Sequence, residues 1–166
     1  MKKIILLFLS ILLFSTTLYS KEKLYSFIGI QTSVAKFDSV SAPTIGLKYG
    51  KQSKDMRTSI SYQYGGKSND TFQSLIMQVD SGILTQTFKD IPFKPYLGAS
   101  FGVIKHKNNK LLTYEDKGFV YGVNTGLSYI LNNNIDLDLG YRFLRTSKMR
   151  EIETINDISF AMHYFY

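Results

Sequence analysis

The chain has 166 residues, a formal net charge of +7 at pH 7, 12 tyrosines, 12 phenylalanines and no cysteine. This length predicts a single domain, and the lack of cysteine excludes a disulfide framework or a thiolate metal site. Beyond the first twenty residues, no apolar stretch approaches the about 20 residues of a transmembrane helix.

Residues 1–20 have the pattern of a cleaved signal peptide. Two lysines precede the apolar stretch 4–14, which only one serine interrupts, and the small Ser20 stands before the expected cut. The stretch is too short to span a membrane, which favours an export signal. We expect residues 21–166 to form the exported domain, with a net charge of +5 once the two signal lysines are lost. An exported protein with this mild excess is not expected to bind nucleic acid.

The rest of the chain consists of short runs in which apolar and polar residues alternate, separated by clusters of Lys, Asn, Asp, Gly and Ser. This period of two predicts β-strands. The pattern is clearest near residues 135–143 and weakest near 73–85, where Ile76 and Leu84 fall on the polar side. We expect eight strands, near residues 24–35, 43–50, 57–65, 73–85, 94–104, 118–131, 135–143 and 157–166.

Alternation alone allows either a soluble barrel or sandwich with an apolar core, or a membrane barrel with apolar residues facing lipid. Glycines recur on the polar face, which suits the crowded interior of a narrow barrel. Tyrosines lie towards the ends of the apolar faces, where an aromatic girdle would meet the lipid boundary. The last run ends with outward aromatic or apolar residues that resemble the signal read by the barrel assembly machinery: Phe160, Met162, Tyr164 and Tyr166.

These observations favour an all-β fold: a closed antiparallel eight-stranded transmembrane β-barrel with up-and-down meander topology. Closure is required because lipid cannot satisfy the backbone groups of an open strand edge. An even strand number would leave both ends of the domain in the periplasm of a bacterial outer membrane. Longer loops are then expected on the outer side, near residues 36–42, 66–71, 105–117 and 144–156.

The sequence resembles the small outer-membrane β-barrel superfamily of the OmpA transmembrane-domain and Opa type. Three features carry the resemblance: the segment Pro95-Tyr96-Leu97-Gly98, the spacing of Gly122 and Gly126, and the aromatic C-terminal strand. The resemblance implies an envelope protein that contacts outer-membrane lipid and lipopolysaccharide. These motifs are patterns and not a functional signature.

Several charged residues fall on the inward face of the expected barrel. Opposite charges should pair there, since an unpaired charge in a narrow lumen is costly. Two interpretations stay open: a polar plug that fills the interior, or a gated path for ions, with a carboxylate pair for acid–base chemistry less favoured. The residues of this expected lumen charge cluster are Lys48, Arg57, Asp80, Asp136, Asp138 and Arg142.

No catalytic, cofactor-binding or metal-binding constellation is expected. His106, predicted in the third outer loop, and His163, predicted inside the periplasmic end, have no second His or Cys at ligand spacing. Some barrels of this size modify lipid A, but neither histidine stands in the His-x-Ser pattern of the deacylases. Asp80 and Ser81 would face opposite sides of the wall, so they do not form a pair of the palmitoyltransferase kind.

Basic residues gather in the two last expected outer loops, and they are either a solvated surface or a contact for lipopolysaccharide phosphates or an anionic host partner. We expect a non-enzymatic outer-membrane protein with a structural or surface-interaction role. The alternative is a narrow channel for ions or small solutes, and a lipid A-modifying enzyme is less favoured. The basic residues are Lys105, Lys107, Lys110, Arg145, Lys148 and Arg150.

Overall fold

The computed structural model describes residues 24–38, 40–82, 91–108 and 114–166. In this part of the chain no helix is long and apolar enough to cross a bilayer. The described residues form eight strands: β1 (Tyr25–Phe37), β2 (Val40–Gln52), β3 (Met56–Lys67), β4 (Asp70–Gly82), β5 (Phe93–Asn108), β6 (Tyr114–Ile130), β7 (Ile135–Ser147) and β8 (Thr154–Phe165).

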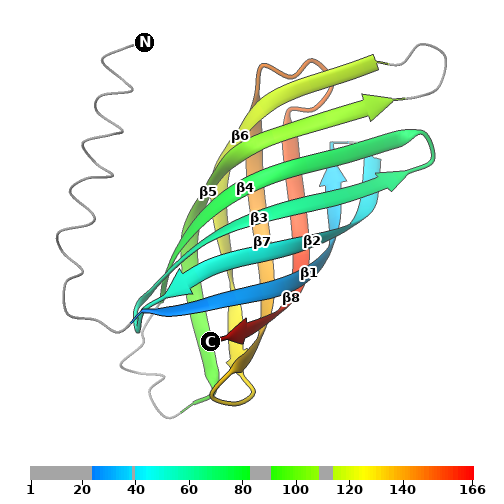
Figure 1. Cartoon of the computed structure of the whole chain (residues 1–166). Helices are drawn as coiled ribbons and strands as arrows, with labels where there is room; N and C mark the ends of the chain where they lie inside the picture. Colours follow the sequence, from blue (N-terminus) through cyan, green and yellow to red (C-terminus); the bar gives the residue numbers. More distant parts are fainter. Residues whose placement is uncertain (1–23, 39, 83–90, 109–113) are drawn as a thin grey trace, which may run out of the picture.

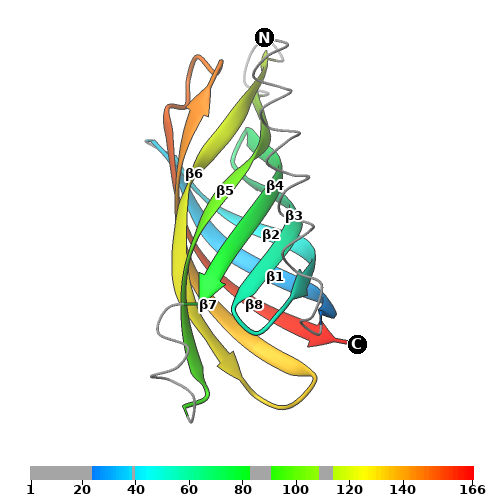
Figure 2. The same ribbon diagram turned by 90° about the vertical axis from the view of Figure 1, so that its left-hand side faces the viewer.

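Each strand pairs antiparallel with the next in the chain, and β8 returns to pair with β1, so the sheet closes. The closing ladder runs from Phe27 opposite Phe165 to Phe37 opposite Ile155. The strands are tilted, and β5 and β6 project beyond their neighbours at one end (Figures 1 and 2). The predicted eight-stranded meander barrel is confirmed.

The outer wall of the barrel is apolar and the inner wall is largely polar. Leu47 is 67% exposed and Val123 is 57% exposed, whereas the inward-facing neighbours Lys48 and Asn124 are 4% and 3% exposed. A soluble protein does not expose a continuous apolar band of this extent, because burying it would be strongly favourable. A closed barrel with such a band matches a transmembrane barrel, in which hydrocarbon covers the exposed side chains.

The strands are longer than predicted, mainly at the end of the barrel remote from the termini. At this end the connections are 38–39, 68–69, 109–113 and 148–153, so most of the predicted loops 36–42, 66–71, 105–117 and 144–156 is strand. Residues 83–90 and 109–113 lie outside the described residues, so the expected difference in loop length between the two sides stays a prediction. Beyond the hydrocarbon, outward positions face water, so charged residues there continue a strand and do not mark a loop.

The expected signal peptide 1–20 and the predicted site residue Lys110 lie outside the described residues. Leu84 also lies outside the described residues. Ile76, the other residue that broke the alternation of its run, is described. Its side chain is 3% exposed and points into the barrel, as the phase of its run requires.

Candidate functional site

The half of the lumen near the termini holds a network of charged side chains. Arg57 on β3 donates through Nε to Asp80 on the adjacent β4 (3.0 Å) and through Nη2 to Asp138 on β7 (2.7 Å). Tyr96 on β5 donates its hydroxyl to Asp138 (2.9 Å), and its ring lies 4.7 Å from the Arg57 guanidinium. Because β3 and β7 are opposite strands of the closed sheet, these bonds cross the bore.

Asp80 accepts further hydrogen bonds from two amide side chains, Gln78 on its own strand β4 and Asn124 on β6. Gln78 Nε2 lies 2.9 and 3.0 Å from its two oxygens, and Asn124 also donates to it. Ser100 in turn donates to Asn124 (2.8 Å). A buried carboxylate needs this saturation, since each unsatisfied lone pair in a dry interior is costly.

Two more pairs of buried side chains complete this network, which we call the charged layer. His163 Nδ1 lies 2.7 Å from Asp136, which also accepts from Ser128 (3.0 Å). Arg142 on β7 forms an ion pair with Asp157 on β8 and reaches across the bore to Gln63 on β3 (2.9 Å). All are buried, so the pairs are held away from solvent.

The six residues of the expected lumen charge cluster are thus all inside the barrel, between 2% and 5% exposed. The structure does not bring them into one site: Arg57, Asp80 and Asp138 form one group, whereas Asp136 pairs with His163 and Arg142 with Asp157. Lys48 interacts electrostatically with the carboxylates of the first group. The partners Asp157 and Gln63 were not predicted.

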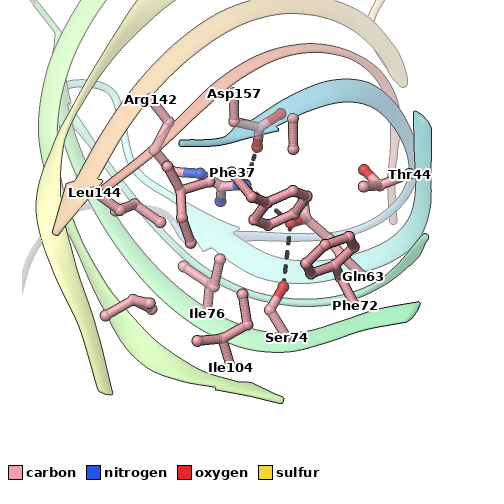
Figure 3. A pocket seen from close by; sticks show the side chains of 13 residues that line it. Phe37, Thr44, Gln63, Phe72, Ser74, Ile76, Ile104, Arg142, Leu144 and Asp157 are labelled. Carbon is pink, nitrogen blue, oxygen red and sulfur yellow. Dashed lines mark hydrogen bonds and ion pairs between the residues drawn. The ribbon is translucent and has the colours of Figure 1, made fainter. Parts of the chain in front are cut away.

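The other half of the lumen is filled by apolar side chains, contrary to the predicted polar bore. Phe37 and Phe72 stack with ring centroids 3.8 Å apart, and aliphatic residues from seven strands and one connection pack with them. Figure 3 shows these side chains converging beside the Arg142–Asp157 pair, where the two layers meet. We call this group the apolar plug; its buried members are Ala35, Phe37, Ala42, Phe72, Ile76, Ile104, Val120, Leu144, Ile152 and Ile155.

A signal for the apolar plug was present in the sequence. Four strands contain two consecutive apolar residues, of which one faces lipid and the other the lumen: Leu75-Ile76, Val103-Ile104, Phe119-Val120 and Phe143-Leu144. These doublets interrupt strict alternation, and of their inward members only Ile76 was noted in the sequence as an irregularity. The cavity left where the two layers meet has a volume of about 20 Å³, too small for a solute.

The prediction that His106 lies in the third outer loop is wrong. Its side chain lies inside the barrel and covers the outer side of the apolar plug. It lies on β5, is 5% exposed, stacks on Phe72 with centroids 4.7 Å apart, and contacts Asp70 through Nε2 at 2.9 Å. Asn108 also donates to Asp70 (2.7 Å). The described residues contain no group of three or more His, Cys, Asp or Glu placed to hold a metal ion.

The predicted basic loop residues are dispersed. Lys105 and Lys107 lie on β5 and Arg145 lies on β7, while Lys148 and Arg150 are exposed in the connection 148–153. Lys105 forms an ion pair with Glu115 (2.7 Å), and so does Lys117, which was not predicted (2.7 Å). The register of the β5–β6 hairpin places Lys117 opposite Lys105, so a prediction of this register from the sequence would have included Lys117.

The residues of the expected assembly signal all face outward at the end of the chain. Phe160, Met162 and Tyr164 on β8 and Tyr166 after it are 48% to 65% exposed. Their inward neighbours His163 and Phe165 pack on Phe27 (4.7 and 5.3 Å between centroids). The last strand therefore separates a lipid-facing row from one that belongs to the lumen.

No protein-family model and no curated protein sequence matches the chain. Among solved structures it is similar to Neisserial surface protein A (20% identity, TM-score 0.68, covering 86% of this chain and 97% of that one). It is also similar to outer membrane protein H of Pseudomonas aeruginosa (19% identity, TM-score 0.63, covering 86% and 99%). The chain has the fold of the small outer-membrane β-barrels. The outer membrane enzyme PagL shares this fold as well (12% identity, TM-score 0.50, covering 82% and 98%).

An outer-membrane barrel of this kind presents three surfaces for chemistry: its lumen, its two ends and its lipid-facing wall. Where the structure describes the lumen, the charged layer and the apolar plug leave a cavity of only about 20 Å³ between them, and a cavity of about 620 Å³ opens beside Arg57, Asp80 and Tyr96 at the end near the termini. The chemistry available to solutes or lipids is therefore at the ends and on the wall.

Proposed function

We propose that this outer-membrane barrel is non-enzymatic and non-conducting, and that it acts through its outer surface, in envelope integrity or in contacts with outer-leaflet lipid. The observation that supports this most directly is the double closure of the lumen. The Arg57–Asp138 bond crosses the charged layer, and the Phe37–Phe72 stack fills the layer beyond it. An ion would have to break buried pairs and then cross an apolar layer without water.

The fold by itself does not exclude an enzyme, since PagL has it too. Both histidines of this chain, however, face the lumen, where His106 is 5% exposed and His163 is fully buried. An acyl chain of a membrane lipid reaches the outer wall of a barrel and not its packed interior. The buried histidines therefore support a non-enzymatic role, and unchanged masses of lipid A in cells producing the chain would agree with it.

Recordings in planar bilayers test the closed lumen. The purified barrel should give no discrete conductance steps, whereas the variant Phe37→Ala/Phe72→Ala/Arg57→Ala/Asp138→Ala should give them, because it removes both the stacked rings and the bond that crosses the charged layer. The lipid-facing pair Phe101→Ala/Phe119→Ala is the matched control, and it should stay silent. Steps in the unmodified protein that change on Asp136→Asn or Arg142→Gln would overturn the proposal in favour of a channel.

The membrane location of the protein is tested by cell fractionation and by gel mobility. The protein should fractionate with the outer membrane and migrate differently on gels with and without boiling, as a closed barrel does until heat opens it. Recovery of the whole population as a soluble periplasmic protein would contradict a membrane role.

A further inference from the structure

An apolar groove of about 350 Å³ lies on the lipid-facing wall across β3 to β6. Its floor is one row of outward side chains that stand opposite one another in consecutive ladders: Tyr62 and Leu75, Leu75 and Val103, Val103 and Phe119. Val103 and Phe119 are 46% and 53% exposed. The floor is thus continuous across four strands and accessible from the membrane.

Lysines line the end of this groove that is remote from the chain termini. The next outward row places Lys105 opposite Lys117, two residues beyond Val103 and Phe119. Lys148 reaches in from the connection 148–153, with its Nζ 5.4 Å from the centroid of the Phe119 ring. Three ammonium groups therefore stand where the apolar floor ends.

Glu115 holds two of these lysines in place and leaves the rim positive. Its carboxylate oxygens lie 2.7 Å from Lys105 Nζ and 2.7 Å from Lys117 Nζ. Hydrogen bonds from these two lysines lower the pKa of Glu115 to about 2, so it is ionised at neutral pH. Three cations against one carboxylate leave the rim with a net positive charge.

A second apolar groove provides an internal comparison. It lies on the wall that runs from β8 through β1, β2 and β3 to β4, shares Tyr62 and Leu75 with the first groove, and is otherwise lined by side chains such as Ile28, Leu47 and Met162. The only charged residue in its described lining is Lys48, whose side chain is buried towards the lumen. This groove suits any hydrocarbon chain, whereas the groove ending at Lys105, Lys117 and Lys148 also suits an anionic headgroup.

We propose that the lysine-rimmed groove binds a phosphorylated glycolipid of the outer leaflet, with an acyl chain along Tyr62, Leu75, Val103 and Phe119 and a phosphate between Lys105, Lys117 and Lys148. Phosphate suits the rim because it accepts several charge-assisted hydrogen bonds at once. The inference deepens the surface role proposed above, and it depends on the termini facing the periplasm, which puts the rim in the outer leaflet.

Native mass spectrometry of the full barrel in detergent micelles tests this site. Bisphosphorylated lipid A is added and compared with its dephosphorylated form and with phosphatidylglycerol. The triple variant Lys105→Gln/Lys117→Gln/Lys148→Gln should lose affinity for bisphosphorylated lipid A roughly tenfold, since each exposed ion pair contributes modestly. The triple variant Lys36→Gln/Lys51→Gln/Lys54→Gln, which removes three exposed lysines elsewhere, should bind like the unmodified protein.

A third variant tests the direction of the effect. Glu115→Gln removes the competing carboxylate, so it should tighten binding of the phosphorylated lipid several-fold, and added salt should weaken the gain. Equal binding of the phosphorylated and dephosphorylated lipids, or equal losses in the two triple variants, would overturn the proposal. Tighter binding of phosphatidylglycerol would assign the groove to a phospholipid and overturn it too. None of these results depends on conductance, so the closed-lumen proposal succeeds or fails separately.

Discussion

Arg57 on β3 and Asp138 on β7 lie on opposite walls of the barrel, yet Arg57 Nη2 is 2.7 Å from the Asp138 carboxylate. The same guanidinium bonds Asp80 on the adjacent strand (3.0 Å), so one cation connects three strands. Both partners of the cross-lumen bond are buried, at 5% and 2% exposed. The bond therefore closes the bore and fixes the distance between its walls.

Removing this cation should be strongly destabilising. Arg57→Met removes the cation that is hydrogen-bonded to the buried Asp80 and Asp138, leaving only the electrostatic interaction with Lys48, and we expect a loss of about 3–5 kcal/mol in the free energy of unfolding. Adding Asp138→Leu to it should recover part of that loss. Urea unfolding followed by gel mobility measures both, with Lys54→Met, an exposed lysine, as the control. Equal midpoints for Arg57→Met and the control would show that the network is dispensable.

Gly122 should not tolerate a side chain. A Cβ there would meet the carbonyl oxygen of Phe143 and lie 2.8 Å from Leu144 Cα, so backbone of the neighbouring strand would have to move. We expect Gly122→Ala to cost about 1–3 kcal/mol. Gly140→Ala is the comparison, because its Cβ would meet only side-chain atoms, the Tyr96 and Ser159 hydroxyls at 2.8 and 3.0 Å, and no backbone of the neighbouring strand would have to move. Thermal midpoints of heat modifiability should therefore fall further for the first variant.

Asp38 should make one end of the barrel sensitive to acid. It accepts hydrogen bonds from Glu153 N (2.6 Å), Thr154 N (3.1 Å) and the Thr154 hydroxyl (2.7 Å), which connects the β1–β2 turn to the β7–β8 connection. Burial raises the pKa of Asp38, but the hydrogen bonds from the Thr154 side chain and the two backbone amides outweigh it, so the pKa is below its ordinary value.

Because the folded pKa is lowered, the stabilisation is complete above the unfolded value of about 3.9 and is lost as pH falls through the folded pKa. Hydrogen exchange of the Glu153 and Thr154 amides should accelerate over this acidic window, relative to other amides of the barrel. Asp38→Asn tolerates the positive φ of 46° at this position and does not titrate. Its exchange should lack the acidic step, and an identical step in this variant would assign the effect to another group.

The outward row of β8 should matter for insertion more than for final stability. Tyr164→Ser/Tyr166→Ser removes two of the exposed aromatic residues at the end of the chain. We expect a clearly smaller heat-modifiable fraction in cells, because the row would be recognised before the barrel closes. Tyr62→Ser/Tyr141→Ser, which changes two lipid-facing tyrosines of other strands, should reduce this fraction much less.

Much of the fold was predictable, because the two faces of a strand meet different solvents and so impose a period of two on the residues. This pattern, with the glycines and the aromatic last strand, was enough for the strand number, the meander and the inward phase of residues such as Lys48 and Asp138. The strand ends were not predictable in the same way. Lys105 and Glu115 are polar in a strand as they would be in a loop, so the longer hairpin becomes visible only in the pairing of β5 with β6.

The partners inside the lumen depend on the register and tilt of the closed sheet, which alternation does not encode. A residue's phase shows that it points inward, but its height in the barrel decides which residue of the opposite wall it meets. Arg57 could therefore be assigned to the interior but not to Asp138, and the doublets that build the apolar plug could not be placed at one level. The groove beside Phe119 arises for the same reason, since pairing of four strands brings its floor and its lysines together.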